Sequence, residues 1–79
     1  MHIHLSRETW KHIRAVAARD IATYTGDSDW TATVQLCKDV HEEIPRGSVG
    51  TLDISPRVLS YILIELDNWY LSTMNLECL

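Results

Sequence analysis

Two pairs of side chains in this sequence have the type and spacing of metal ligands. His2 and His4 lie two residues apart in a segment that alternates polar and apolar residues, so on an extended chain both point to one side. Cys37 and His41 lie four residues apart, so on a helix they share a face. Four such ligands could surround a zinc ion. Because the chain has no Cys-x-x-Cys pair and no tight four-ligand spacing, we expect neither a metal site nor another cofactor.

Nucleophilic catalysis is the second chemistry to consider. A Cys or Ser nucleophile needs a base within hydrogen-bond reach and a third group that orients this base. Cys37 and His41 supply at most the first two, and Cys37 falls on an apolar helix face, where a buried thiol behaves as a small hydrophobic group. Ser6 and Ser55 stand where helix caps are expected. The loop 46–50 lacks the lysine and the spacing of a phosphate-binding loop. We therefore expect that the protein is not an enzyme.

Acidic residues are the remaining polar feature, and they gather on and around the second expected helix. The chain carries 11 acidic against 7 basic residues, a formal charge of −4. A tryptophan beside them would supply an aromatic anchor of the kind that interfaces favour. The residues that we assign to partner binding are Asp27, Asp29, Trp30, Asp39, Glu42 and Glu43. The alternative is a solvated face that only keeps the protein soluble.

The charge balance also bears on the class of partner. Phosphate neutralisation by Lys and Arg supplies most of the non-specific affinity for nucleic acid, and the bases of this chain, scattered from Arg7 to Arg57, form no run. We therefore expect no direct binding to nucleic acid. A protein partner with a basic surface fits better, because complementary charge speeds association. An acidic face could also imitate the spacing of phosphates and occupy a nucleic-acid-binding groove.

Hydrophobic periodicity divides the chain into two short extended segments and three helices. Residues 2–5 and 51–54 alternate polar and apolar residues, which is typical of a strand with one buried face. Helical spacing of apolar residues predicts helices over 7–24, 28–43 and 56–73. The resulting order is β-α-α-β-α.

Cap residues support these boundaries. Ser6 precedes the first helix, with Glu8 in its first turn, and Ser55-Pro56 opens the third. Residues 3–6 and 52–55 repeat one pattern, apolar-polar-apolar-serine, and each leads into a helix. We predict an α+β, mainly α fold: a three-helix bundle packed with a short two-stranded β-ribbon, parallel or antiparallel. A plain three-helix bundle with extended arms is the alternative.

Each helix has an apolar face that we expect to form the core. On the first helix this face comprises Trp10, Ile13, Ala17, Ile21 and Tyr24. On the second helix it comprises Trp30, Val34, Cys37, Val40 and Ile44. On the third helix it comprises Leu59, Ile62, Leu63, Leu66, Trp69 and Tyr70.

The third helix carries more apolar residues than one small core needs. Val58, Tyr61, Ile64 and Leu71 cover much of its remaining circumference. A helix that is apolar nearly all round is normally buried on every side. Because small domains often gain stability from oligomerisation, we expect Tyr61, Ile64 and Leu71 to form an interface, either by self-association as a homodimer or with another protein. The alternative is a crowded core within one chain.

Length and cysteine usage limit the number of domains and the compartment. Seventy-nine residues are typical of a single domain, which we place over residues 1–79. Cys37 and Cys78 are too few for the disulfide framework of a small secreted protein and predict free thiols in a reducing compartment. The start of the chain has no secretory pattern, and the longest apolar run is far too short for a membrane span. We expect a cytoplasmic protein that does not bind membranes.

No motif ties the chain to a family, but its composition resembles a type of protein. Small, acidic, compact proteins without catalytic residues are common among inhibitors that block a larger partner, including phage-encoded inhibitors of bacterial defence systems such as anti-CRISPR proteins. The resemblance implies a non-enzymatic protein-binding module that inhibits a nucleic-acid-handling partner. An obligate homodimeric structural or regulatory subunit is the alternative, and a metal- or thiol-dependent enzyme is the least favoured.

Overall fold

The computed structural model describes the backbone of residues 1–77 and the side chains of residues 1–69, and it has the predicted order β-α-α-β-α. The elements are β1 (His2–Leu5), α1 (Arg7–Tyr24), the 3-10 turn η1 (Ser28–Trp30), α2 (Thr31–Glu43), β2 (Gly50–Asp53) and α3 (Pro56–Glu77). The structure therefore confirms a mainly helical α+β fold. The plain bundle is excluded, because the two extended segments pair.

Serine caps start α1 and α3, as predicted. The Ser6 hydroxyl accepts a hydrogen bond from the backbone N–H of Thr9 at 3.2 Å, and the Ser55 hydroxyl accepts one from Val58 at 3.3 Å. Each cap satisfies one of the donors that the first turn of a helix leaves without an intrahelical partner. α1 ends before Gly26, whose backbone φ of 94° is a left-handed conformation that glycine adopts without strain.

The second predicted helix consists of two elements. η1 is one turn of tighter helix that begins after Asp27, whose carboxylate accepts a hydrogen bond from the N–H of Asp29 at 3.0 Å. α2 then starts at Thr31 without a side-chain cap of its own. A hydrogen bond from a backbone N–H to the side chain of an aspartate two residues earlier competes with the start of a regular α-helix. The prediction of one helix over 28–43 is therefore right in extent and wrong in its first turn.

β1 and β2 form a two-stranded antiparallel sheet, the orientation that the sequence left open. Its register pairs Ile3 with Leu52, so matching apolar positions of the two repeated segments lie opposite each other. These two side chains are partly buried against the core, whereas His4 and Thr51 are exposed and share a hydrogen bond of 2.9 Å. The ribbon depends on the helices behind it, as expected for two strands alone.

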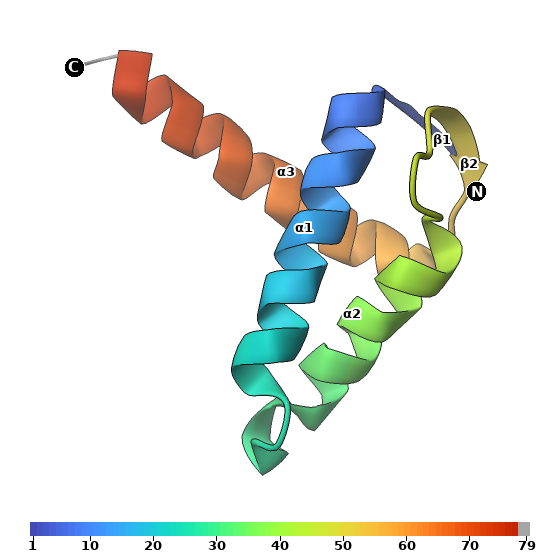
Figure 1. Ribbon diagram of the computed structural model, residues 1–79. Coiled ribbons are helices and arrows are strands. Elements are labelled where there is room, and N and C mark those ends of the chain that lie inside the picture. Colours follow the sequence, from blue (N-terminus) through green and yellow to red (C-terminus); the bar gives the residue numbers. More distant parts are fainter. Residues whose placement is uncertain (78–79) are drawn as a thin grey trace.

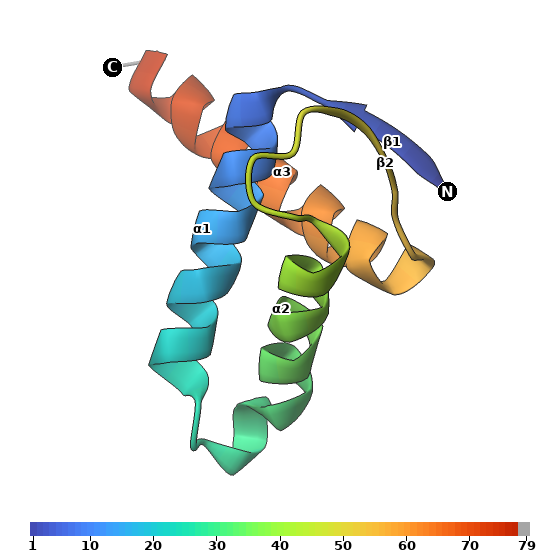
Figure 2. The same cartoon turned by 45° about the vertical axis from the view of Figure 1, so that its right-hand side comes forward.

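The helices form two layers (Figures 1 and 2). α1 and α2 lie antiparallel as a hairpin, and α3 crosses them on one side, with the sheet at the end where α1 begins and α2 finishes. The core lies between these layers. Its largest fully buried side chains are Trp10, Ile13, Ile44, Ile54, Ile62, Val40, Val58 and Cys37. On α1 and α2 most of the buried residues lie on the predicted faces. Val16 is buried although it was not predicted, and Trp30, which was predicted, is 41% exposed.

The buried face of α3 differs from the prediction. Val58, Tyr61 and Ile62 are buried, whereas Leu63 is 59% and Trp69 is 40% exposed. The reason is the path of α3, which crosses the hairpin steeply and extends past α1, so that only its first half meets the core (Figure 1). The crossing angle between helices decides which of two apolar faces is buried. Neither α3 nor any other helix in the described part of the chain is long and apolar enough to cross a membrane.

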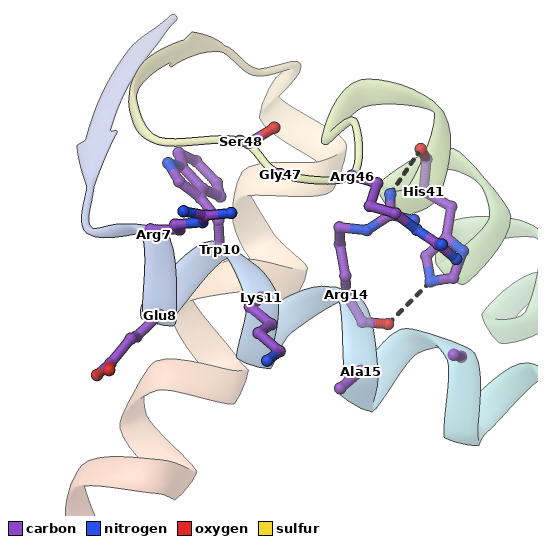
Figure 3. A pocket seen from close by; sticks show the side chains of 11 residues that line it. Arg7, Glu8, Trp10, Lys11, Arg14, Ala15, His41, Arg46, Gly47 and Ser48 are labelled. Carbon is purple, nitrogen blue, oxygen red and sulfur yellow. Dashed lines mark hydrogen bonds between the residues drawn. The ribbon is translucent and has the colours of Figure 1, made fainter.

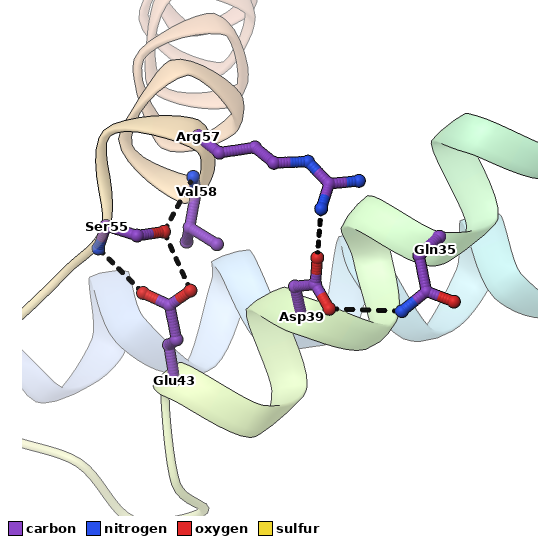
Figure 4. Close-up of polar contacts among 6 residues, drawn as sticks. All are labelled: Gln35, Asp39, Glu43, Ser55, Arg57 and Val58. Carbon is purple, nitrogen blue, oxygen red and sulfur yellow. Dashed lines mark hydrogen bonds and ion pairs between the residues drawn. The ribbon is translucent and has the colours of Figure 1, made fainter.

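A carboxylate at the end of α2 fixes the start of α3 (Figure 4). Glu43 accepts two hydrogen bonds from Ser55, one from the backbone N–H at 2.7 Å and one from the hydroxyl at 2.8 Å. Because hydrogen bonds to charged groups contribute about 1.5–3 kcal/mol, we expect Glu43→Ala to lower the free energy of unfolding by roughly 2 kcal/mol. Urea denaturation measures this change. Glu42→Ala is the matched control, since Glu42 is exposed. An equal loss in both variants would contradict the role assigned to Glu43.

Candidate functional site

The four side chains that resembled metal ligands are not gathered around one point. His41 donates its Nε2–H to the backbone carbonyl of Arg14 at 2.8 Å, and Cys37 is fully buried in the core. His4 bonds a threonine hydroxyl across the sheet, and His2 is exposed on the same strand. Among the described residues, no group of three His, Cys, Asp or Glu side chains is arranged to hold a metal ion. His4, Cys37 and His41 instead contact or pack against neighbouring residues of the fold.

Cys37 belongs to a small polar cluster inside the core. Burial raises the pKa of its thiol above the ordinary value, and a hydrogen bond with Tyr61 offsets this only in part. The Tyr61 hydroxyl lies near both groups and donates to the Asp20 carboxylate at 3.1 Å in the structure, and burial likewise raises the pKa of this phenol. Nucleophilic chemistry uses the thiolate, which a raised pKa disfavours at neutral pH. Cys37 thus has the environment of a structural thiol. Cys78, the other expected free thiol, lies outside the described residues.

Glu65 lies near this cluster and makes stability depend on pH. Burial raises the pKa of its carboxyl group above the ordinary value of 4.5, and the charge of Asp20 raises it further, against opposing effects of Arg19 and His12. The folded protein therefore binds this proton more tightly than the unfolded chain does. The resulting stabilisation is complete below pH 4.5 and is lost as the pH rises through the folded-state pKa.

We therefore expect Glu65→Gln, which cannot ionise, to be more stable than the unchanged protein at pH 7. The thermal midpoint should rise by a few degrees, and the difference should close at a pH below 4.5. Thermal unfolding followed by circular dichroism on both sides of that pH measures the two quantities. Asp67→Asn removes an exposed carboxylate from the same helix and serves as the control. A difference of the same size at both pH values would show that ionisation of Glu65 is not the cause.

Two of the acids assigned to a partner are used within the fold (Figure 4). Asp39 forms an ion pair with Arg57 at 2.7 Å and accepts a hydrogen bond from Gln35 at 3.1 Å. Glu43 holds the cap of α3. Near the end of α2, Glu42 is exposed and has no hydrogen bond or ion pair within the described residues. The acidic surface available to a partner here is therefore smaller than the sequence indicates.

The other assigned residues meet at the tip of the α1–α2 hairpin. Trp30 is 41% exposed and stacks on Tyr24, with ring centroids 4.3 Å apart and ring planes inclined by 19°. Asp27 and Asp29 are both exposed in the same turn. The expectation that Trp30 belongs to the core is wrong, because η1 places its ring on Tyr24 at the surface. The tip therefore presents an oriented indole ring next to two carboxylates.

The structure divides the predicted acidic surface into two parts. α2 has 13 residues, and an α-helix rises about 1.5 Å per residue, so about 20 Å separate the tip from Glu42. The tip residues are close enough together to lie within one contact patch. A partner seated on the tip would reach Glu42 only at the rim of its interface, where charges contribute little to affinity.

Of the three residues assigned to self-association, two have side chains that the structure describes, and one of these two is exposed. Tyr61 is only 7% exposed, so the expectation that it faces another chain is wrong; its hydroxyl is bonded inside the domain. Ile64 is 60% exposed on α3, next to the exposed Leu63. The side chains of Leu71 and Tyr70 lie outside the described residues. Ile64 therefore remains as a candidate for an interface between chains.

A basic hollow, absent from the expectations based on sequence, lies beside the start of α1 (Figure 3). It has a volume of about 550 Å³ and is bounded by α1 from Arg7 to Ala18, by His41 near the end of α2 and by the loop from α2 to β2. Four of the seven Lys and Arg residues of the chain line it: Arg7, Lys11, Arg14 and Arg46. The spacing of the first three places them on one helix face and was visible in the sequence. Arg46 could not have been included, because only the fold brings its loop beside α1.

No family model, no curated protein and no solved structure matches this chain. The functional argument therefore depends on the geometry of three surfaces: the hairpin tip, the exposed part of α3 and the basic hollow.

Proposed function

We propose that this chain is a small, non-enzymatic protein-binding module that contacts a partner through the hairpin tip, defined as Tyr24, Asp27, Asp29 and Trp30. The observation that carries the proposal is the exposed Trp30 ring, which stacks on Tyr24 beside two exposed carboxylates. A side chain that is already held in place loses little conformational entropy on binding. Tryptophan and tyrosine are also among the side chains most enriched in interface hot spots.

The charge of the tip supports a partner with a basic surface. Asp27 and Asp29 form no ion pair within the described residues, so their charges are available to steer association. A nucleic-acid-handling protein offers such a surface in its nucleic-acid groove. Our assignment is an inhibitor that occupies this groove in a reducing compartment such as the cytoplasm. The resemblance in composition to phage-encoded inhibitors of defence systems supports this assignment, and the raised pKa of the Cys37 thiol supports a role without catalysis.

The test compares three tagged proteins as baits in a cell lysate, with the bound proteins quantified by mass spectrometry. The unchanged protein and Asp67→Lys, which reverses an exposed charge on α3, should retain the same partner. The double variant Asp29→Lys, Trp30→Ala should lose it by about tenfold or more. Circular dichroism checks that this variant is folded. Equal capture by all three baits would show that the tip does not contact the partner. Capture of a partner without a basic surface would contradict the assignment as an inhibitor but would still support the tip as the contact surface.

Exposed apolar residues on α3 favour a second candidate function, that of a homodimeric structural or regulatory subunit. Leu63 and Ile64 are 59% and 60% exposed, and Trp69, which stacks on His12, is 40% exposed. α3 crosses the hairpin and extends beyond it (Figure 2). Neighbouring apolar residues at a surface often mark an interaction site, and small domains gain stability from oligomerisation.

Light scattering after size exclusion tests this candidate over a range of micromolar protein concentrations. A dimer built through α3 would have twice the mass of the 9.1 kDa chain. Ile64→Asp should return the mass to that of the monomer, whereas Asp29→Lys should leave the dimer intact. A monomer at every concentration would remove the homodimer from consideration.

A further inference from the structure

The charge of the basic hollow is opposite to that of the whole chain. Four basic residues and one acid, Glu8, line it, although acids outnumber bases by 11 to 7 over the sequence. Positive charge is therefore concentrated on one face of the first half of α1. A concave surface lined by charge of one sign raises the local concentration of ligands of the other sign. The hollow thus attracts anions, while the remaining surface repels them.

Three of the four cations are available to a ligand. Arg14 is not, because its guanidinium donates to two backbone carbonyls at the end of α2. Arg7, Lys11 and Arg46 are exposed and form no ion pair within the described residues. In Figure 3 the carboxylate of Glu8 extends away from the side chains of Arg7 and Arg46, and Glu8 forms no ion pair within the described residues.

The N-terminal end of α1 adds to the positive potential. Arg7 and Glu8 begin an 18-residue helix, whose aligned peptide dipoles place about half a positive charge at this end. The first N–H groups of a helix lack intrahelical carbonyl partners, and such helix starts bind anions. On the other side, Arg14 covers the negative end of α2 by binding its last carbonyls.

The size and the residue types of the hollow select the class of anion. Its volume of about 550 Å³ lies within the range of about 300–1,000 Å³ that is typical of small-molecule sites. Guanidinium groups bind phosphate oxygens in pairs, and a lysine adds a point charge. Arg7 and Lys11 come from α1 and Arg46 comes from the loop that faces it, so cationic residues line the hollow on two sides.

We propose that this hollow binds a small phosphate-bearing molecule, and that a diphosphate or triphosphate group binds more tightly than a single phosphate. Three available cations match the several negative charges of such a group. A nucleic acid fits less well, because its backbone needs an extended row of cations and the surrounding surface is acidic.

This site is independent of the proposed partner surface. The hollow is lined by residues of α1 from Arg7 to Ala18, whereas the tip begins at Tyr24, the last residue of that helix (Figure 1). Anion binding and partner binding use charges of opposite sign. The two proposals therefore stand or fall on separate experiments.

The experiment adds inorganic pyrophosphate to the isotope-labelled full chain at fixed ionic strength and follows the backbone amide signals by NMR. We expect saturable shifts confined to residues 7–18 and 46–48. Lys11→Glu should weaken binding by about tenfold or more, and Arg46→Ala should weaken it similarly from the opposite wall. Lys38→Glu makes the same change as Lys11→Glu at an exposed lysine of α2 outside the hollow and should leave the affinity unchanged.

The outcomes distinguish a specific binding site from non-specific electrostatic attraction. Shifts that do not saturate, or equal weakening in Lys11→Glu and Lys38→Glu, would overturn the proposal. Parallel titrations with inorganic phosphate and ADP identify the form of the ligand. Tighter binding of ADP than of pyrophosphate, which has the same number of phosphates, would show that Ala15 and Ala18 hold an organic group, and equal binding would show recognition of the phosphates alone. Binding of a single-stranded oligonucleotide without binding of any small phosphate would also overturn it.

Discussion

Replacing Trp10 with alanine is expected to leave the chain without a cooperative unfolding transition. Trp10 is fully buried, and its indole N–H donates to the backbone carbonyl of Gly50 at 2.9 Å, which ties α1 to the start of β2. A buried Trp→Ala substitution costs about 3–5 kcal/mol, and a core of this size supplies about 3–5 kcal/mol in total. The loss is therefore as large as the whole stability of the fold. Circular dichroism and one-dimensional NMR of the variant, with urea denaturation of the unchanged protein, measure it.

Two further tryptophan variants identify the cause of this loss. Trp10→Phe keeps most of the ring volume but leaves the Gly50 carbonyl without its donor, so we expect a folded protein that is less stable by about 1–3 kcal/mol. Trp30→Ala removes the same atoms from the exposed tip and should remain folded. A Trp10→Ala variant that unfolds cooperatively at an unchanged urea midpoint would contradict the assignment of this residue to the core.

The order of the elements could be predicted because its determinants are local. The bonds from Ser6 and Ser55 that cap α1 and α3 reach only three residues along the chain. Alternation around Ile3 and Leu52 marks the faces of the strands that pair. The antiparallel orientation could not be predicted in the same way, because it depends on where the α1–α2 hairpin returns the chain.

The buried face of α3 illustrates a limit of periodicity. Leu59, Ile62 and Leu63 have helical spacing, and so do Val58, Tyr61 and Ile62, so the sequence offers two overlapping apolar faces. The crossing angle between α3 and the hairpin selects the second, which turns Leu63 outward. This angle results from the packing of side chains on three helices and is not encoded in the spacing along one of them.

The candidate sites could be predicted only in part, because the charges that define them are paired or gathered by the fold. Asp39 and Glu43 look like free acids in the sequence, but their partners Arg57 and Ser55 lie 18 and 12 residues later. Arg46 joins the cations of α1 only once α2 has folded back. Net charge is a sum over the chain and contains no information on such segregation. A chain with a formal charge of −4 can therefore present a cationic hollow.

Arg14→Ala is expected to be strongly destabilising, since Arg14 bonds α1 to α2 in both directions. Its guanidinium donates to the backbone carbonyls of His41 and Ile44, and His41 donates its Nε2–H to the Arg14 carbonyl. Carbonyls at the end of a helix have no intrahelical donors, so the substitution leaves these groups partly buried and unsatisfied. We expect a loss of roughly 2–4 kcal/mol in the free energy of unfolding, together with faster hydrogen exchange in the last turn of α2. Urea denaturation and exchange followed by NMR measure the two effects.

Arg19→Ala is the matched control, because Arg19 lies on the same helix, its side chain is 73% exposed, and its contact with Asp20 is 3.9 Å long. Its stability should change by no more than about 0.5 kcal/mol. Comparison with Lys11→Glu then tests the division of roles within the hollow. Lys11→Glu should keep the stability of the unchanged protein and bind pyrophosphate more weakly, whereas the main effect of Arg14→Ala should be a loss of stability. If Arg14→Ala were as stable as Arg19→Ala, the Arg14 guanidinium would not be committed to α2. The hollow would then offer four cations to an anion instead of three.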